Sequence, residues 1–87
     1  MPSLTSEVLR AARALLRWDQ RNLAEASSIS LATIKRLESK PGPLDAHTST
    51  VAALTHALEM AGIAFIEENG GGPGVRLRKR QLTRKLK

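Results

Sequence analysis

Apolar residues recur every three or four positions through the first half of the chain, a spacing typical of amphipathic helices. In the first such stretch we expect a helix that Thr5 caps and that runs to about Arg17. Its apolar positions are Val8, Ala12, Leu15 and Leu16. Three arginines, Arg10, Arg13 and Arg17, follow a neighbouring face of the same helix. The pattern therefore predicts one buried side and one basic side.

Two short helices separated by a tight turn are predicted next. Asp19 is a good N-cap for a helix from Gln20 to about Ser27, with Leu23 on its buried side. After a break at residues 28–29, Ser30 caps a third helix, Leu31 to about Ser39, whose inward positions are Ile34 and Leu37. The following Lys-Pro-Gly-Pro run must end it, because two prolines in four residues cannot continue a helix.

A fourth helix and a β-hairpin are expected in the second half. Asp45 is predicted to open a helix that runs through about Ala61, and Gly62 stands where a left-handed residue is wanted. The apolar positions of this helix are Val51, Leu54 and Leu58. From Gly62 on, apolar and other residues alternate, which predicts a hairpin over residues 63–79. Its glycine-rich turn lacks the Gly-Lys-Ser/Thr ending of a phosphate-binding loop.

These elements predict a mainly α fold. We expect a four-helix domain over residues 1–62, a β-hairpin extension over 63–79 and a flexible tail over 80–87. The composition agrees, since 41% of the residues are hydrophobic but only 2% are aromatic. The chain has no cysteine, so disulfides and thiolate metal sites are excluded, and dimerisation is the expected means of stabilising so small a core. We expect the hairpin to contribute to the dimer, because its apolar strip exceeds what four short helices cover; the fourth helix is the rival surface.

The net charge of +6 comes from the C-terminal end. Seven of the fourteen lysines and arginines fall within residues 76–87, where no acid occurs, whereas residues 1–75 are close to neutral. The tail is therefore interpreted either as a solubilising charge run or as an arm that binds nucleic acid non-specifically; we favour the arm. Overall basicity by itself does not identify the folded part as a DNA-binding protein.

Residues 20–38 carry the most specific signal in the chain, two short helices around a tight turn with small Ala24 inside. The segment resembles the helix-turn-helix of phage repressor and Cro-like regulators, the XRE family, and the resemblance spans roughly residues 6–62. The matching positions are Trp18, Gln20, Leu23, Ala24, Ser30, Thr33, Ile34, Leu37 and Glu38. Two positions depart from the family pattern: Ser28 stands where glycine is usual, and Leu31 replaces a polar residue. A left-handed serine costs on the order of 1 kcal/mol.

The resemblance implies a lambda-repressor-like domain whose third helix enters the major groove of DNA. The residues then expected at the DNA are Gln20, Ser30, Leu31, Ala32, Thr33, Lys35, Arg36 and Lys40. Arg36 is the best base reader, because a guanidinium bonds guanine in bidentate fashion, and Leu31 and Ala32 suit thymine methyl groups. Gln20 would approach a phosphate or a base edge, while Lys35, Lys40 and Thr33 would hold phosphates. The family also pairs an arginine of the first helix with the glutamate that ends the third, here Arg13 with Glu38.

We therefore expect a transcriptional regulator, a repressor or an autoregulator, that binds a double-stranded DNA operator with two half-sites as a homodimer. The alternative is a protein-interaction module such as a toxin-binding antitoxin, with a protein partner on the hairpin or a helix groove. RNA binding through the tail is disfavoured, because Phe65 is the only phenylalanine and the chain has no tyrosine for base stacking.

Catalysis, metal binding and membrane insertion find no support in the sequence. The serines at 27, 28 and 30 have no histidine near them, so we expect neither an enzyme nor a cofactor. His47 and His56 are nine residues apart without a set of ligands around them, which favours surface positions over a metal site. Charged residues interrupt every apolar run near the N-terminus, so we expect a cytoplasmic protein with no membrane segment.

Overall fold

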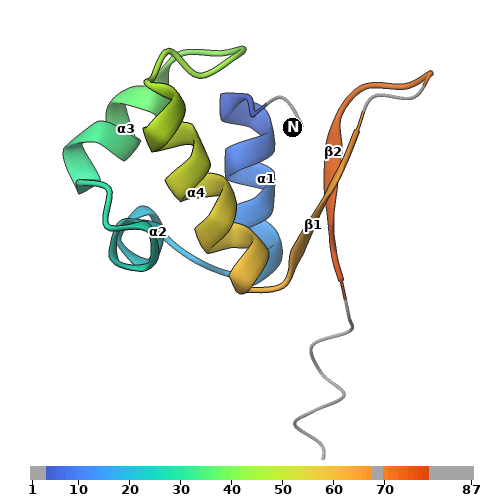
Figure 1. The fold of residues 1–87 in the computed structure, drawn as a ribbon, viewed down its shortest axis with the longest axis horizontal. Coiled ribbons are helices and arrows are strands. Elements are labelled where there is room, and N and C mark those ends of the chain that lie inside the picture. Colours follow the sequence, from blue (N-terminus) through green and yellow to red (C-terminus); the bar gives the residue numbers. More distant parts are fainter. Residues whose placement is uncertain (1–3, 68–69, 79–87) are drawn as a thin grey trace, which may run out of the picture.

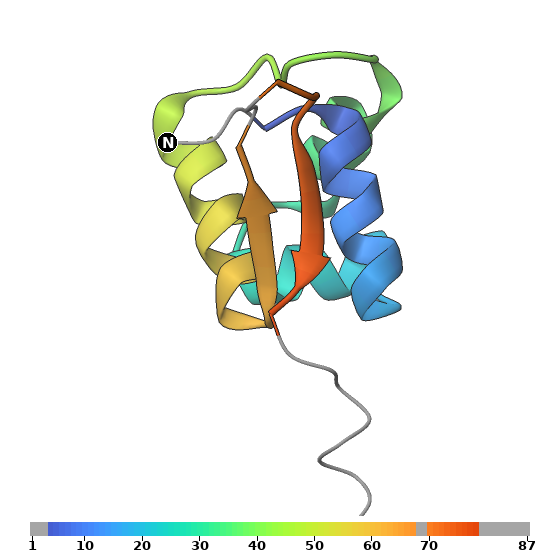
Figure 2. The same ribbon diagram turned by 90° about the vertical axis from the view of Figure 1, so that its right-hand side faces the viewer.

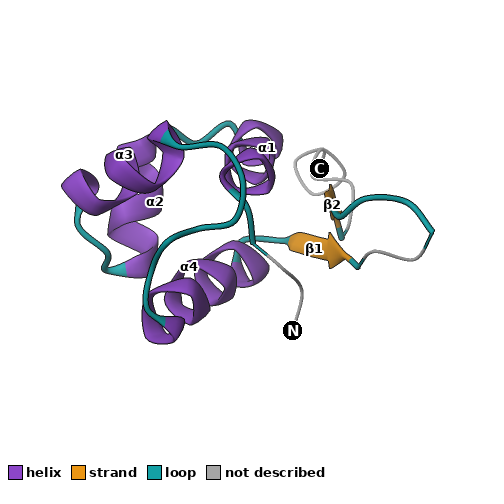
Figure 3. Cartoon of the chain, turned by 90° about the horizontal axis from the view of Figure 1, so that it is seen from above, coloured by secondary structure: helices purple, strands orange, loops and turns teal. Residues whose placement is uncertain are grey.

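A computed structural model describes residues 4–67 and 70–78, in which four helices are followed by an antiparallel hairpin (Figure 1). The elements are α1 (Ser6–Leu16), α2 (Gln20–Ser27), α3 (Leu31–Ser39), α4 (Thr48–Met60), β1 (Ile63–Ile66) and β2 (Gly74–Leu77). Seen from above, α2 and α3 lie on one side of α1 and α4, and the hairpin lies on the other (Figure 3). The predicted tail, residues 80–87, lies outside the described residues.

The first three helices begin at the predicted caps. The Thr5 hydroxyl accepts a hydrogen bond from the Val8 amide at 3.1 Å, and the Ser30 hydroxyl accepts one from the Thr33 amide at 3.1 Å. At α2 the cap is reciprocal, because the Asp19 carboxylate accepts from the Asn22 amide while the Asn22 side chain accepts from the Asp19 amide. Each bond satisfies an amide that the helix itself leaves without a partner.

The predicted start of the fourth helix is wrong by three residues. Helix α4 begins at Thr48, and its N-cap residue, His47, makes no side-chain capping bond. Segment 43–46 stays outside the helix because the Leu44 amide donates to the Leu4 carbonyl at 3.2 Å and Thr5 pairs with Pro43 in an antiparallel bridge. Leu44 also packs against the core, so tertiary contacts override the capping preference of Asp45.

The core lies between the helices, and its α1 side differs from the expected one in two positions. Leu9, not among the predicted core positions, is fully buried, whereas Leu15 is 40% exposed. The buried stripe of α1 includes Val8, Leu9 and Ala12, which places Leu15 beyond its edge. The other buried apolar residues are Leu4, Leu23, Ile34, Leu37, Leu54, Ala57, Leu58 and Ile63. The predicted inward positions Leu23, Ile34 and Leu37 are among them, whereas Ala24, also predicted inside, is only partly buried and packs against the core.

The hairpin closes this core instead of leaving an apolar strip uncovered. Figure 2 shows the two strands in front of the helices, with β1 on the side of α4 and β2 on the side of α1. Phe65 pairs with Val75 and Ile63 with Leu77, so all four side chains share one face of the hairpin. These residues belong to the core or pack against it. The apolar strip that was the reason to expect dimerisation through the hairpin is therefore covered by the protein's own helices.

The open end of the hairpin, where β1 begins and β2 ends, is bonded to α4. Gly62, between α4 and β1, has a φ of +112°, which a side chain would strain, and its amide donates to the Glu59 carbonyl. Directly after β2, at the same end of the hairpin, the Arg78 guanidinium donates to that same carbonyl at 3.1 Å. These bonds tie the end of the hairpin to the last turn of α4.

In the part of the chain that the structure describes, no helix is both long and apolar enough to cross a membrane.

Candidate nucleic-acid interface

Helices α2 and α3 are joined by a turn of three residues that side-chain hydroxyls and one left-handed residue shape. Ser28 has φ 62° and ψ 21°, the conformation expected at the position where a glycine is usual in the family that the sequence resembles. The Ser27 hydroxyl donates to the Leu23 carbonyl at 2.7 Å and accepts from the Ile29 amide at 3.2 Å. The turn thus keeps its backbone groups bonded while it redirects the chain into α3.

Helix α3 has two faces of different character. Ile34, Leu37 and Glu38 are buried, whereas Ala32, Lys35 and Arg36 are exposed. Its one acid, Glu38, lies on the buried face, so the outward charges of the helix are both positive. Lys40, directly after the helix, is exposed as well and adds a third cation.

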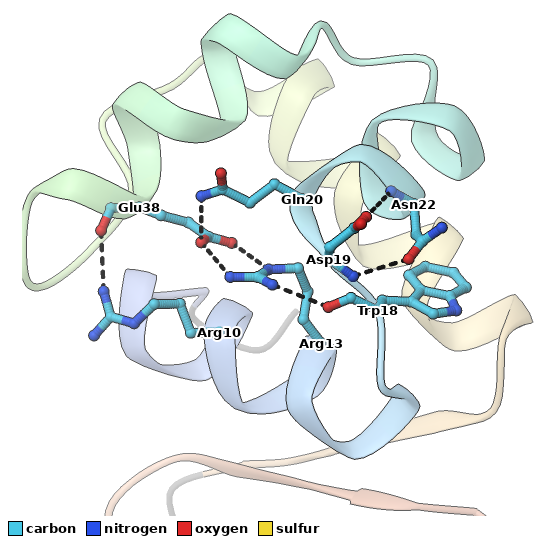
Figure 4. Close-up of polar contacts among 7 residues, drawn as sticks. All are labelled: Arg10, Arg13, Trp18, Asp19, Gln20, Asn22 and Glu38. Atoms are coloured by element: carbon cyan, nitrogen blue, oxygen red, sulfur yellow. Dashed lines mark hydrogen bonds and ion pairs between the residues drawn. The ribbon is translucent and has the colours of Figure 1, made fainter.

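Glu38 connects α3 to the rest of the domain through four hydrogen bonds (Figure 4). Arg13 donates to both carboxylate oxygens, from Nε at 2.9 Å and from Nη2 at 2.7 Å. The Gln20 side chain donates to Oε1 at 2.9 Å, and Arg10 donates to the Glu38 carbonyl at 3.0 Å. The predicted Arg13–Glu38 pair is therefore confirmed as a bidentate, charge-assisted contact.

The Arg13–Glu38 pair is largely shielded from water. The Glu38 side chain is only 3% exposed and the Arg13 side chain 17%. Arg13 also donates from Nη1 to the Trp18 carbonyl at 3.0 Å, so its guanidinium is held on two sides. Its hydrogen bonds to Glu38 raise the pKa of Arg13 above its ordinary value, while burial acts in the opposite direction. The pair thereby orients α3 relative to α1.

The residues predicted to meet DNA fall into two groups: side chains open to solvent on or next to α3, and two side chains, those of Ser30 and Gln20, that make structural hydrogen bonds. Ala32, Lys35, Arg36 and Lys40 are exposed, and Leu31 and Thr33 are partly exposed, all on or next to α3. The Ser30 hydroxyl caps α3 and donates to the Thr33 hydroxyl at 2.9 Å. Gln20 lies at the start of α2, and its side-chain amide donates a hydrogen bond to the Glu38 carboxylate. This is a structural contact that the sequence did not predict.

Two further residues at this surface were not predicted there. Arg10 supports the end of α3, a role that its position one turn before Arg13 on the same helix face is compatible with. Asp45 lies beside Arg36, since the two residues line the same two hollows between α3 and the segment before α4.

The histidines have no ligand set around them. Both His47 and His56 are exposed, and within residues 4–67 and 70–78 no group of three or more His, Cys, Asp or Glu side chains is placed to hold a metal ion.

The chain matches no known protein-family model, and no characterised protein matches it in sequence. The interpretation of this surface therefore depends on its own geometry.

Proposed function

We propose that this chain is a sequence-specific DNA-binding regulator of the phage repressor and Cro-like kind, with α3 in the major groove. The observation that carries the proposal is the division of α3 between Ile34, Leu37 and Glu38, which hold the helix to the domain, and Ala32, Lys35 and Arg36, which face solvent. A major groove accepts one helix whose outward side chains contact base edges. A rigidly held helix with only cations among its outward charges has the properties that such docking requires.

Each outward residue has a part in this proposal. Arg36 reads guanine, because its guanidinium matches the O6 and N7 acceptors in the major groove. Ala32 and the partly exposed Leu31 contact thymine methyl groups. Lys35 and Lys40 bind phosphates and set the position of the helix along the duplex.

We further propose that the protein acts as a homodimer on two half-sites. One such module makes few base contacts, whereas a two-fold pair doubles them on an inverted repeat. The half-sites would then lie roughly 10 base pairs apart, centre to centre, or a multiple of that distance.

The test is selection of duplexes from a random pool by the purified full chain, followed by affinity measurements on the enriched duplex and a scrambled one at matched salt. We expect an enriched inverted repeat and much tighter binding to it than to the scrambled duplex. Equal affinity for both duplexes would contradict the proposal, because electrostatic attraction alone does not distinguish sequences.

Two single substitutions then separate base reading from phosphate binding. Arg36→Ala should lower affinity for the enriched duplex by about 1–3 kcal/mol and change binding to the scrambled one little. Lys40→Ala should weaken binding to both alike and make the salt dependence shallower by about one unit of slope. Arg76→Ala, an exposed arginine of the hairpin far from α3, is the matched control. If Arg36→Ala leaves the ratio of the two affinities unchanged, Arg36 does not read bases.

A further inference from the structure

Asp45 is an acid at the proposed DNA-binding surface for which the fold provides no use. It does not cap α4, whose N-cap residue is His47. The carboxylate is exposed, and it accepts no hydrogen bond from any residue that the structure describes. An unpaired carboxylate at a surface that meets a polyanion repels phosphates, so its presence there calls for a physical reason.

The position of Asp45 relative to Arg36 supplies that reason. An open hollow of about 400 Å³ lies between α3 and the start of α4, lined by Thr33, Arg36, Asp45, Ala46, His47 and Thr50. A second, smaller hollow is lined by Arg36, Leu37, Lys40, Pro43 and Asp45. Asp45 is the one acid in either lining, so Arg36 and Asp45 border the same two hollows.

Asp45 and Arg36 border the same hollows without forming an ion pair. Among the described residues the only contact within 4.0 Å between opposite charges is Arg13–Glu38, so Arg36 keeps all its donors free. At a longer separation the carboxylate still lowers the electrostatic attraction of Arg36 for a phosphate. It leaves untouched the fixed donor geometry that matches guanine.

We propose that Asp45 is a specificity-determining residue that acts through Arg36, by suppressing the binding of that arginine to phosphates and thereby favouring base recognition. This inference depends on the proposed function. Specificity is a difference between two affinities, and a repulsive group that weakens the wrong complex raises it as effectively as a new attractive contact. The other exposed acids of the described chain line neither hollow beside Arg36, so they lack this effect.

The test compares Asp45→Asn with Glu67→Gln in the full chain, using the enriched and the scrambled duplex at matched salt. Both variants remove one exposed carboxylate, but Glu67 follows β1 on the far side of the domain from α3. We expect Asp45→Asn to bind scrambled DNA more tightly and to lower the ratio of specific to non-specific affinity by about threefold, the effect of an exposed charge acting through water. Glu67→Gln should leave that ratio within twofold of the parent.

The double variant Asp45→Asn with Arg36→Ala separates this role from a structural one. If Asp45 acts through Arg36, Asp45→Asn should no longer change the affinity ratio once Arg36 is absent. A carboxylate that merely favours the positive end of α4 would change the thermal unfolding temperature and leave the ratio as it was.

Two results would overturn the inference. The first is an affinity ratio for Asp45→Asn equal to that of Glu67→Gln. The second is the same change in the affinity ratio in the presence and absence of Arg36. A pool that yields no enriched duplex overturns the proposed function itself, and this inference with it, and so is distinguishable from either result.

Discussion

Glu38 is the residue on which the orientation of α3 depends. Its carboxylate accepts three hydrogen bonds, two from Arg13 on α1 and one from Gln20 on α2, although it is nearly inaccessible to water. A buried charge of this kind adds little net stability when paired, but removing one partner is costly because the other charge loses its compensation. The contact therefore selects one arrangement of three helices.

Glu38→Ala should lower the free energy of unfolding by about 3 kcal/mol, since it leaves the Arg13 guanidinium partly buried without its carboxylate. Glu25→Ala, an exposed glutamate on α2, should change it by less than about 0.5 kcal/mol. Urea unfolding followed by the fluorescence of Trp18, the single tryptophan, measures both. Equal midpoints for the two variants would show that water compensates the stranded cation.

Ser28 is the second residue where local strain matters, because its φ of 62° lies in the left-handed region that side chains disfavour. Ser28→Gly should therefore raise the free energy of unfolding by about 0.5–1 kcal/mol. Ala26→Gly, at an exposed position inside α2, the helix that Ser28 ends, should instead lower the free energy of unfolding by about 1 kcal/mol. Thermal unfolding of both variants distinguishes the backbone effect from a general effect of glycine; the same sign for both would refute the strain argument.

At the scale of elements, the N-terminal segment holds the connection between α3 and α4. The Ser6 amide donates to the Gly42 carbonyl at 2.9 Å, and the Gly42 amide donates to the Glu7 carboxylate at 3.1 Å. Hydrogen bonds from the backbone amides of Glu7 and Gly42 lower the pKa of Glu7 below its ordinary value of 4.5. The start of α1 thus positions the connection that precedes Asp45 and α4.

Because the pKa of Glu7 is lower in the folded than in the unfolded protein, its contribution is present above pH 4.5 and is lost as the pH falls through the folded value. The parent should therefore be more stable than Glu7→Gln near pH 7, and the two should converge toward pH 2. Denaturant unfolding across that range measures the difference. A constant difference between the proteins at every pH would assign the effect to something other than ionisation.

Local signals in the sequence predicted the elements that depend on local contacts. Thr5, Asp19 and Ser30 cap the helices they were expected to cap, because an N-cap bond spans only three residues. The start of α4 was missed because the bond from Leu44 to Leu4 joins residues 40 positions apart. The hydrogen bond of Gln20 to Glu38 was missed for the same reason, since no local pattern reports it.

Prediction of the site followed the same division. The exposed positions of α3 follow from helical periodicity once Ile34 and Leu37 are taken as buried. The proximity of Asp45 to Arg36 depends on how the connection after α3 folds back, which three-dimensional contacts with residues 4–7 determine. Sequence periodicity therefore located α3 and its exposed face but not the acidic residue beside it.

At the scale of the whole molecule, the hairpin is part of the core. Its two faces differ, since Phe65 and Val75 pack against the helices whereas Ile66, paired with Gly74 on the other face, is 43% exposed. A chain that ends at Gly62 loses the fully buried Ile63 together with this cover. We expect that shortened chain to lose cooperative unfolding, because its lost burial is comparable to the whole stability of a small domain.

Phe65→Ala and Ile66→Ala in the full chain separate folding from self-association. Phe65→Ala should lower the free energy of unfolding by about 2–3 kcal/mol, while Ile66→Ala should change it by less than about 0.5 kcal/mol. Sedimentation of both variants then reports on the dimer. A monomeric but fully stable Ile66→Ala protein would assign the outer face of the hairpin to the dimer interface; a dimer unchanged by both would assign it elsewhere.

The separation of the two faces of α3 also bears on how readily such a protein acquires a new target. Ile34, Leu37 and Glu38 make the contacts to the domain, while the side chains of Ala32, Lys35 and Arg36 make no hydrogen bond to any described residue. Exchanging the outward three therefore leaves the scaffold intact, and surface changes of this kind cost little stability. Under the proposed function, divergent copies of the chain can thus be retargeted to unrelated DNA sequences, by natural drift or by library selection, without first regaining a stable fold.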